Sequence, residues 1–231
     1  MTRDEQRIAA AEAAAALVED GMVVGLGTGS TAAHFIDTLI RRVRDEGLRI
    51  TAIPTSKRSD RQARDGGIRM TNFAAERAID LTVDGADQIL LGRLDLVKGL
   101  GGALLREKIV AAASKRLVII ADGSKLVDRL GGLVPIPVEV VEFGWESTAA
   151  RIEKLGGTPV RRWPENSDQP FRTDGGNYIL DCTFGELPDP SGLEQALSYT
   201  IGVVESGLFI GMADTALVGT DEGVKRFDKA G

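Results

Sequence analysis

The feature that most constrains this chain is a repeated order: a short apolar run, a polar or glycine-rich cluster, then a helical pattern. The apolar runs cover 22–27, 49–53, 79–83, 94–97 and 116–121, and the clusters cover 27–31, 54–58, 84–87, 98–102 and 122–125. Continuously apolar strands that alternate with helices are typical of a parallel sheet covered on both faces. Because ligands bind beyond the carboxyl ends of such strands, the five clusters predict one site at that edge.

The pattern changes after about residue 131. Strands are expected at 134–140, 158–162, 177–184 and 203–209, with helices at 145–155 and 192–199. This β-α-β-β-α-β order is that of a ferredoxin-like unit. We therefore predict an α/β fold with two domains. A doubly wound, Rossmann-like main domain covers 1–130 plus 210–231, and a smaller ferredoxin-like α+β domain covers 131–209.

Composition excludes several classes of function. The 231 residues carry 28 Lys plus Arg against 34 Asp plus Glu, a net charge of −6, so no basic stripe is available for a nucleic-acid partner. Cys182 is the only cysteine, which rules out an internal disulfide and favours a reducing compartment. No secretory signal and no apolar run of about 18 residues is visible. We expect a soluble, cytoplasmic protein without membrane contact.

The sequence Gly-Leu-Gly-Thr-Gly-Ser-Thr at 25–31 lies where a strand meets a helix. Free amides, hydroxyl groups and a helix N-terminus together suit a phosphate. The alternative is that Ser30 or Thr31 is only an N-cap, with no ligand. The dinucleotide fingerprint G-x-G-x-x-G is not met because position 30 is serine, and no Walker lysine follows.

Three carboxylates are candidates for acid–base chemistry. Asp84 and Asp87 follow an apolar strand, where they could share proton transfer or merely cap a turn. Glu107 lies in an expected helix over 102–114, and its neighbours three and four positions away are apolar. A carboxylate there is either paired in a salt bridge or desolvated, and desolvation raises its pKa toward the range of a general base.

Other polar residues have simpler interpretations. Taken alone, Lys125 is a surface lysine in a turn, and His34 is a packing or capping residue of its helix. Cys182 is expected in the core as a small apolar side chain. Arg161 and Arg162 are expected to face solvent.

Together these motifs resemble the ribose-5-phosphate isomerase A family, and the resemblance runs nearly end to end. No single string is specific, but the joint order and spacing are. The strings are 27–32, 84–87, 98–108 and 122–125 in the first part, and 137–140, 155–157 and 202–209 in the second.

The resemblance implies interconversion of ribose 5-phosphate and ribulose 5-phosphate, in the non-oxidative pentose phosphate pathway, through an enediolate and without metal or organic cofactor. It assigns Glu107 as the base that moves a proton between C2 and C1, and Lys98 as the group that stabilises charge on the enediolate oxygens. Asp84 would assist opening of the furanose ring, with Asp87 nearby. The substrate-binding residues would be Thr28, Gly29, Ser30, Thr31, Ser56, Gly85, Ala86, Gly99, Gly101, Gly102, Lys125 and Arg7.

The chain departs from the family pattern in three places. Arg7 stands where the family commonly has lysine, which keeps the charge but changes its geometry. Leu100 stands where many members have glycine, and 54–59 matches the family's Thr-Ser loop only in part. The family suggests a homodimer or a homotetramer.

Two other functions fit the sequence less well. A non-catalytic sugar-phosphate sensor that regulates transcription needs a DNA-binding module, yet fewer than 25 residues precede the first expected strand. A nucleotide-cofactor oxidoreductase needs the third fingerprint glycine, which is absent here.

Overall fold

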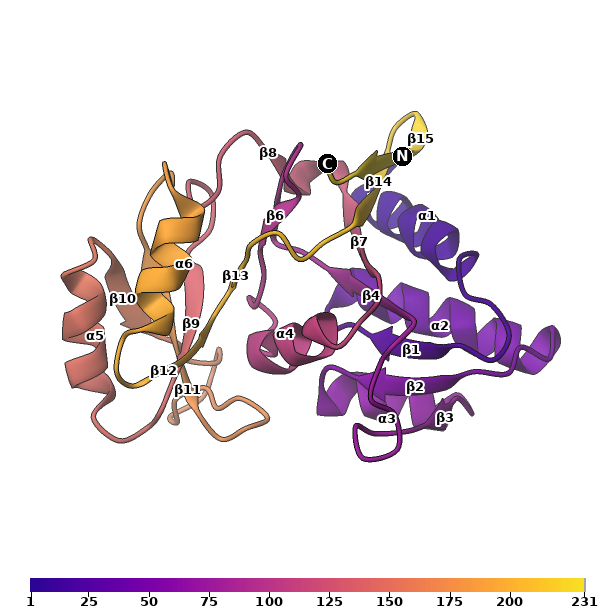
Figure 1. Cartoon of the computed structure of the whole chain (residues 1–231), viewed down its shortest axis with the longest axis horizontal. Coiled ribbons are helices and arrows are strands. Elements are labelled where there is room, and N and C mark those ends of the chain that lie inside the picture. The colour runs from indigo at the N-terminus through magenta and orange to yellow at the C-terminus, as the bar shows by residue number, and fades with distance from the viewer. Residues whose placement is uncertain (231) are drawn as a thin grey trace.

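The computed structural model describes residues 1–230, and its largest sheet has seven strands (Figure 1). The strand order is β15-β14-β7-β4-β1-β2-β3, and every neighbouring pair is parallel except β14 with β15. The α/β fold with a mainly parallel sheet is therefore confirmed. The strands are β1 (Val23–Leu26), β2 (Thr51–Pro54), β3 (Arg69–Met70), β4 (Leu81–Gly85), β7 (Leu117–Asp122), β14 (Thr215–Thr220) and β15 (Gly223–Asp228).

Helices α1 (Arg3–Ala15), α2 (Ser30–Asp45) and α3 (Lys57–Asp65) bury apolar side chains against one face of this sheet. Thr2 starts α1 with a capping box, because its hydroxyl accepts from Glu5 N and the Glu5 carboxylate accepts from Thr2 N. Helix α4 (Leu104–Ala112) lies on the opposite face, where Val110 packs on Ile53 and Ile79. Both faces of the sheet are thus covered, which explains why β7 is buried along its whole length.

A small mixed sheet packs on the same side as α4, in the order β13-β6-β5-β8. It contains β5 (Gln88–Leu90), β6 (Asp95–Val97), β8 (Leu126–Val127) and β13 (Leu208–Phe209). The expectation that 94–97 belongs to the parallel sheet is wrong. About ten residues separate β4 from β6, too few for a parallel crossover, so β6 pairs antiparallel with β5 across a turn at Gly92. The cluster at 98–102 therefore approaches the site from a second sheet.

The remaining elements form an antiparallel sheet in the order β10-β11-β9-β12, with two helices on one face (Figure 1). The elements are β9 (Ile136–Val140), α5 (Trp145–Glu153), β10 (Thr158–Arg161), β11 (Tyr178–Thr183), α6 (Pro190–Ser198) and β12 (Val203–Ser206). Their order along the chain is the predicted one. The expected strand 203–209 is divided at Gly207, where a Cβ atom would lie 2.2 Å from the Lys98 carbonyl oxygen. The domain boundaries at 130/131 and 209/210 stay predictions.

The expectations about individual side chains have different outcomes. Cys182 is fully buried, as predicted. The prediction that Arg161 and Arg162 face solvent is wrong: Arg161 stacks on aromatic rings, and the Arg162 side chain is 13% exposed and paired with Asp181. His34 lies 3.2 Å from a carboxylate oxygen of Asp4 on α1. Within the described residues, none of the helices has the length and apolar character that a membrane span requires.

Candidate active site

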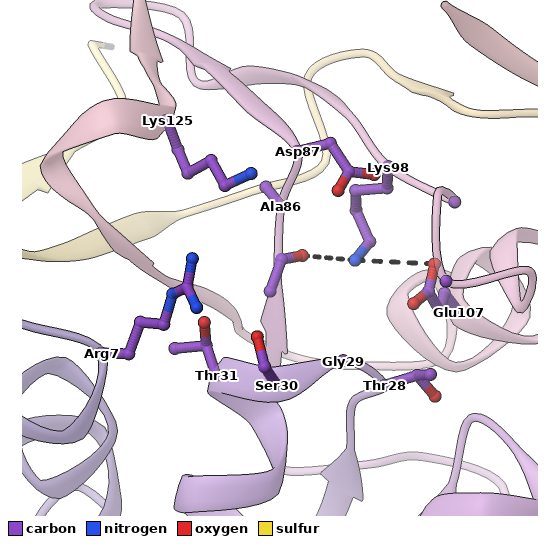
Figure 2. A pocket seen from close by; sticks show the side chains of 13 residues that line it. Arg7, Thr28, Gly29, Ser30, Thr31, Ala86, Asp87, Lys98, Glu107 and Lys125 are labelled. Carbon is purple, nitrogen blue, oxygen red and sulfur yellow. Dashed lines mark hydrogen bonds and ion pairs between the residues drawn. The ribbon is translucent and has the colours of Figure 1, made fainter. Parts of the chain in front are cut away.

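A cavity of about 100 Å³ opens where β1 and β4 end, between the parallel sheet and the small mixed sheet (Figure 2). The side chains around it come from α1, the β1–α2 turn, the end of β4, the 98–102 loop, α4 and the turn η1 (Gly123–Lys125). The lining residues are Arg7, Thr28, Gly29, Ser30, Thr31, Gly85, Ala86, Asp87, Lys98, Gly99, Gly101, Glu107 and Lys125. Each of them is a predicted site residue. Three others, Asp84, Ser56 and Gly102, do not line the cavity.

The β1–α2 turn presents a helix N-terminus to this cavity. Gly29 is the N-cap residue, with φ +118°, a backbone conformation that favours glycine, and no side chain caps the helix. The alternative that Ser30 or Thr31 serves as N-cap is therefore wrong. Ser30 and Thr31 line the cavity, and their hydroxyl groups together with the free N–H groups of the first turn of α2 suit an anion.

Thr28 is held by a network of hydroxyl groups behind the turn. Its Oγ1 lies 2.7 Å from Thr55 Oγ1 and donates to Ser56 Oγ at 2.8 Å, and Ser59 Oγ donates to the Gly27 carbonyl at 2.6 Å. Ser56 is the N-cap residue of α3 and is 5% exposed. The structure thus places Ser56 behind Thr28, where it orients the turn.

Two cationic side chains lie near Ser30 and Thr31 at the N-terminus of α2 (Figure 2). Arg7 comes from α1 and Lys125 from η1, and both line the cavity. Arg7 Nε donates to Asp122 Oδ2 at 2.8 Å, and Ser124 N donates to Asp122 Oδ1. Burial opposes ionisation of Asp122, but the hydrogen bonds from Ser124 and Arg7 outweigh it and hold the pKa of this carboxyl below its usual value. Asp122 thereby fixes the Arg7 guanidinium.

Lys98 lies at the end of the cavity next to Glu107 and is 2% exposed. Its Nζ lies 3.0 Å from Asp84 Oδ2 and 3.6 Å from Glu107 Oε2, and it donates to the Gly85 carbonyl. Burial by itself lowers the pKa of Lys98, but the attraction of Asp84 and Glu107 exceeds that effect and raises the pKa above its ordinary value. Lys98 is therefore a positive charge held next to the cavity.

Asp84, at the end of β4, is 1% exposed and lies behind Lys98. Burial raises its pKa, while Lys98 and the N–H groups of Thr28 and Gly85, at 3.0 and 2.8 Å from Oδ1, oppose that rise. A Cβ atom at Gly27 would lie 2.2 Å from the same oxygen, so glycine is required there. Asp84 thus connects the β1–α2 turn to Lys98.

Glu107 points into the cavity from α4 and is 3% exposed (Figure 2). Its Oε2 has no hydrogen-bond partner within residues 1–230. Burial raises its pKa to about 8, and the nearby charge of Asp84 acts in the same direction, against the attraction of Lys98. The alternative of a salt bridge is only partly realised, because Lys98 is 3.6 Å away and closer to Asp84. Such a carboxyl group suits a general base near neutral pH.

The 98–102 loop forms the rest of the cavity wall near Lys98 and Glu107. Leu100 N donates to Asp87 Oδ2 at 3.0 Å, and the Gly101 N–H has no hydrogen-bond partner among the described residues. Gly102 faces away from the cavity, where a Cβ atom would lie 2.3 Å from the Phe171 ring. Sequence reasoning missed the supporting role of Phe171, which lies in a loop without periodicity. It included Asp122 in the 122–125 cluster but gave this carboxylate no role, although an acid at the end of a buried strand was a usable signal.

The family model of ribose 5-phosphate isomerase A (phosphoriboisomerase A) matches residues 51–223. The chain belongs to this family. It is 54% identical to the ribose-5-phosphate isomerase A of Gloeobacter violaceus over 97% of this chain and 96% of that protein. The Gluconobacter oxydans protein of the same name is 52% identical, over 95% and 94%.

Solved structures of ribose 5-phosphate isomerases agree with these matches. The enzyme from Methanocaldococcus jannaschii is 39% identical, with a TM-score of 0.95 over 99% of this chain and all of that chain. A D-ribose-5-phosphate isomerase solved with phospho-erythronic acid is 36% identical, with a TM-score of 0.96 over 99% of this chain and all of that chain. The resemblance predicted from the motifs is confirmed, and as a member of the family the chain is an aldose–ketose isomerase.

Proposed function

We propose that the cavity holds the open-chain form of ribose 5-phosphate and that Glu107 moves one proton between C2 and C1 to give ribulose 5-phosphate. The observation that carries this proposal is the buried Glu107 carboxyl group, whose Oε2 accepts no hydrogen bond within residues 1–230 and lies 3.6 Å from the Lys98 ammonium. The relative solved with phospho-erythronic acid supports it, because that ligand combines a phosphate with a carboxylate, as the reaction's intermediate combines a phosphate with enediolate oxygens.

The phosphate end of the substrate is assigned to the β1–α2 turn. Ser30, Thr31 and the N-terminus of α2 offer neutral donors, and Arg7 and Lys125 supply two positive charges beside them. Charge-assisted hydrogen bonds from such a set fix the sugar at one end. Fixing one end keeps the reacting carbons within reach of the base, which removes much of the entropic barrier.

The reacting end is assigned to Lys98, Glu107 and the Gly101 N–H. Glu107 takes the C2 proton, and electron density moves onto the C1 oxygen. The proton of the C2 hydroxyl passes to that oxygen, and Glu107 returns its proton to C1, which leaves a C1 hydroxyl and the C2 ketone. Lys98 and the Gly101 N–H then meet the oxygens on which negative charge develops. Each preorganised donor of this kind is worth about 3–4 kcal/mol of transition-state stabilisation.

Ring opening precedes this proton transfer. The Asp84 carboxylate contacts Lys98 rather than the cavity, so we assign its part in ring opening to an effect through the Lys98 ammonium. Asp87 does line the cavity and is available to the ring oxygen and the anomeric hydroxyl.

The test is incubation of the purified protein with ribose 5-phosphate in deuterated water, followed by NMR. Wild-type protein should form ribulose 5-phosphate and place deuterium at C1, where Glu107 exchanges its proton with solvent. Glu107→Gln should bind substrate but turn over at least about a thousandfold more slowly, because the amide cannot accept the proton. Glu142→Gln, an exposed glutamate paired with Arg172, is the matched control and should be fully active. Binding without turnover by wild-type protein would instead favour the sugar-phosphate sensor.

We also propose that the chain forms a homodimer or homotetramer and that it acts in the cytoplasm. Large apolar side chains exposed to solvent support an interface between copies: Leu133 is 75% exposed, Phe143 95%, Tyr199 79% and Ile201 76%. Light scattering on the purified protein measures the assembly, and a monomer across the micromolar range would contradict it.

A further inference from the structure

Arg162 directly follows β10 and reaches from the antiparallel sheet to the loop that carries Lys98. Its Nε donates to Asp181 Oδ2 at 2.8 Å, and its Nη2 donates to the other oxygen of that carboxylate. Its Nη1 donates to the carbonyl oxygens of Gly99 and Leu100, at 3.1 and 3.0 Å. The planar guanidinium allows this double use, because its N–H groups diverge in fixed directions. Arg162 thus joins the antiparallel sheet to the 98–102 loop.

This loop needs support from outside. Gly99 and Gly102 have φ values of +101° and +82°, and glycines give a loop many accessible conformations. The Gly99 carbonyl also accepts from Gly102 N at 3.0 Å within the loop. The Leu100 carbonyl, within residues 1–230, accepts a hydrogen bond only from Arg162. The orientation of the peptide after Leu100 therefore depends on this side chain.

The orientation of the Leu100–Gly101 peptide determines which hydrogen-bond donor the loop presents to a ligand in the cavity. The peptide bonds of the described chain are trans, and in a trans peptide the C=O and N–H bonds point in opposite directions. Because Arg162 holds the carbonyls of Gly99 and Leu100, the N–H groups of Leu100 and Gly101 point away from it. The first meets Asp87 Oδ2, and the second is unpaired in a residue that lines the cavity.

We propose that Arg162, held by Asp181, is a positioning residue for the isomerisation. It fixes the 98–102 loop so that Lys98 and the Gly101 N–H face the sugar oxygens on which charge develops. Arg162 does not line the cavity, and the Arg162 and Asp181 side chains are 13% and 23% exposed. The inference rests on the proposed function of the site. Since these loop donors act most strongly on the charged intermediate, loss of Arg162 should reduce kcat far more than it raises KM.

The first test replaces Arg162 with methionine, which keeps an apolar stem and removes every hydrogen bond to the loop. We expect kcat to fall about 10- to 100-fold with KM changed less than about threefold, because a displacement near 1 Å at reacting groups costs about that much. Guanidinium ion added in millimolar amounts should restore part of kcat. The control is Arg161→Met, since Arg161 stacks on Trp145 at 4.5 Å and makes no hydrogen bond to the loop. Its kcat should equal that of wild type.

The second test uses Asp181→Asn. If Asp181 acts only through Arg162, the double variant with Arg162→Met should have the kcat of Arg162→Met alone, and multiplied losses would contradict that route. Should Arg162→Met fail to fold by thermal unfolding, Arg162→Lys decides, since lysine keeps the charge without the fork. A kcat equal to wild type in a folded Arg162 variant, or a rise in KM alone, overturns the proposal. Failure of the proposed function is distinguishable, because wild-type protein would then not convert ribose 5-phosphate.

Discussion

Replacing Glu107 with glutamine should stabilise the fold at alkaline pH, although it removes the base. The pKa of Glu107 is raised from 4.5 to about 8, chiefly by burial. A folded state with a raised pKa holds its proton more tightly than the unfolded chain does. Its stability is therefore greatest below pH 4.5 and decreases as pH rises toward about 8, where the buried carboxylate becomes charged. Glutamine is uncharged throughout, so the variant does not lose stability in this way.

The size of the effect follows from the two pKa values. Each pH unit between 4.5 and about 8 corresponds to about 1.4 kcal/mol, which gives an upper limit of about 5 kcal/mol above pH 8. When Glu107 is ionised, structural relaxation and entry of water lower its cost below this limit. We therefore expect the free energies of unfolding of Glu107→Gln and wild type to differ by about 2–5 kcal/mol at pH 9. Near pH 5, where Glu107 is protonated, glutamine has nearly the same shape, and the two proteins should differ by less than about 1 kcal/mol.

The assay is urea unfolding of wild type and Glu107→Gln at pH 5, 7 and 9, with thermal unfolding as a second measure. Glu142→Gln is the control, because Arg172 and Tyr178 lower the pKa of Glu142 to about 2. The stability that Glu142 contributes is fully present above its unfolded-state pKa of 4.5. It is lost only as pH falls below the range tested. Its difference from wild type should thus be constant from pH 5 to 9. A stability difference for Glu107→Gln that is equally flat would refute the assignment of a raised pKa.

Three further outcomes are expected. The kcat/KM of wild type should rise from pH 7 and level off above about 8, because only ionised Glu107 accepts the proton; a pH-independent value from 7 to 9 would contradict this. Lys125→Ala should raise KM about 10- to 100-fold with little change in kcat, as expected for loss of a charged hydrogen bond of about 1.5–3 kcal/mol, and an unchanged KM would remove Lys125 from the phosphate site. Gly27→Ala places a Cβ atom 2.2 Å from the Asp84 carboxylate, so it should lower both thermal stability, by about 1–3 kcal/mol, and kcat; normal values of both would contradict the close approach.

Local signals in the sequence predicted the parts of the site that depend on local structure. The burial of Glu107 follows from apolar neighbours on its own helix, and the free α2 N-terminus follows from glycines between a strand and a helix. The roles of these residues in catalysis stay predictions. The contact of Lys98 with Asp84 could not be predicted in the same way, because it joins two sheets whose pairing no local pattern encodes.

The errors have identifiable physical causes. Strands of two or three residues, such as β5 and β6, are too short to show periodicity, so the small mixed sheet was missed. Two consecutive residues at the end of a strand point to opposite faces, and for that reason Arg161 and Arg162 could not both face solvent. Strand alternation alone was enough to predict that one of them turns toward the rest of the fold. The other, Arg161, is covered because it stacks on the Trp145 and Trp163 rings, a contact that no local pattern encodes. Which partner it meets there is determined by tertiary structure.

The return of the chain into the seven-stranded sheet has a consequence during synthesis. Strand β7 pairs with β14 on one side, yet β14 begins at Thr215, long after β7 ends at Asp122 (Figure 1). Until the ribosome has released β14, the nascent chain exposes an apolar edge, Leu117 to Ala121, with unpaired N–H and C=O groups. Such an edge is a template for aggregation, so translation products truncated before Thr215 should require chaperones that shield β7.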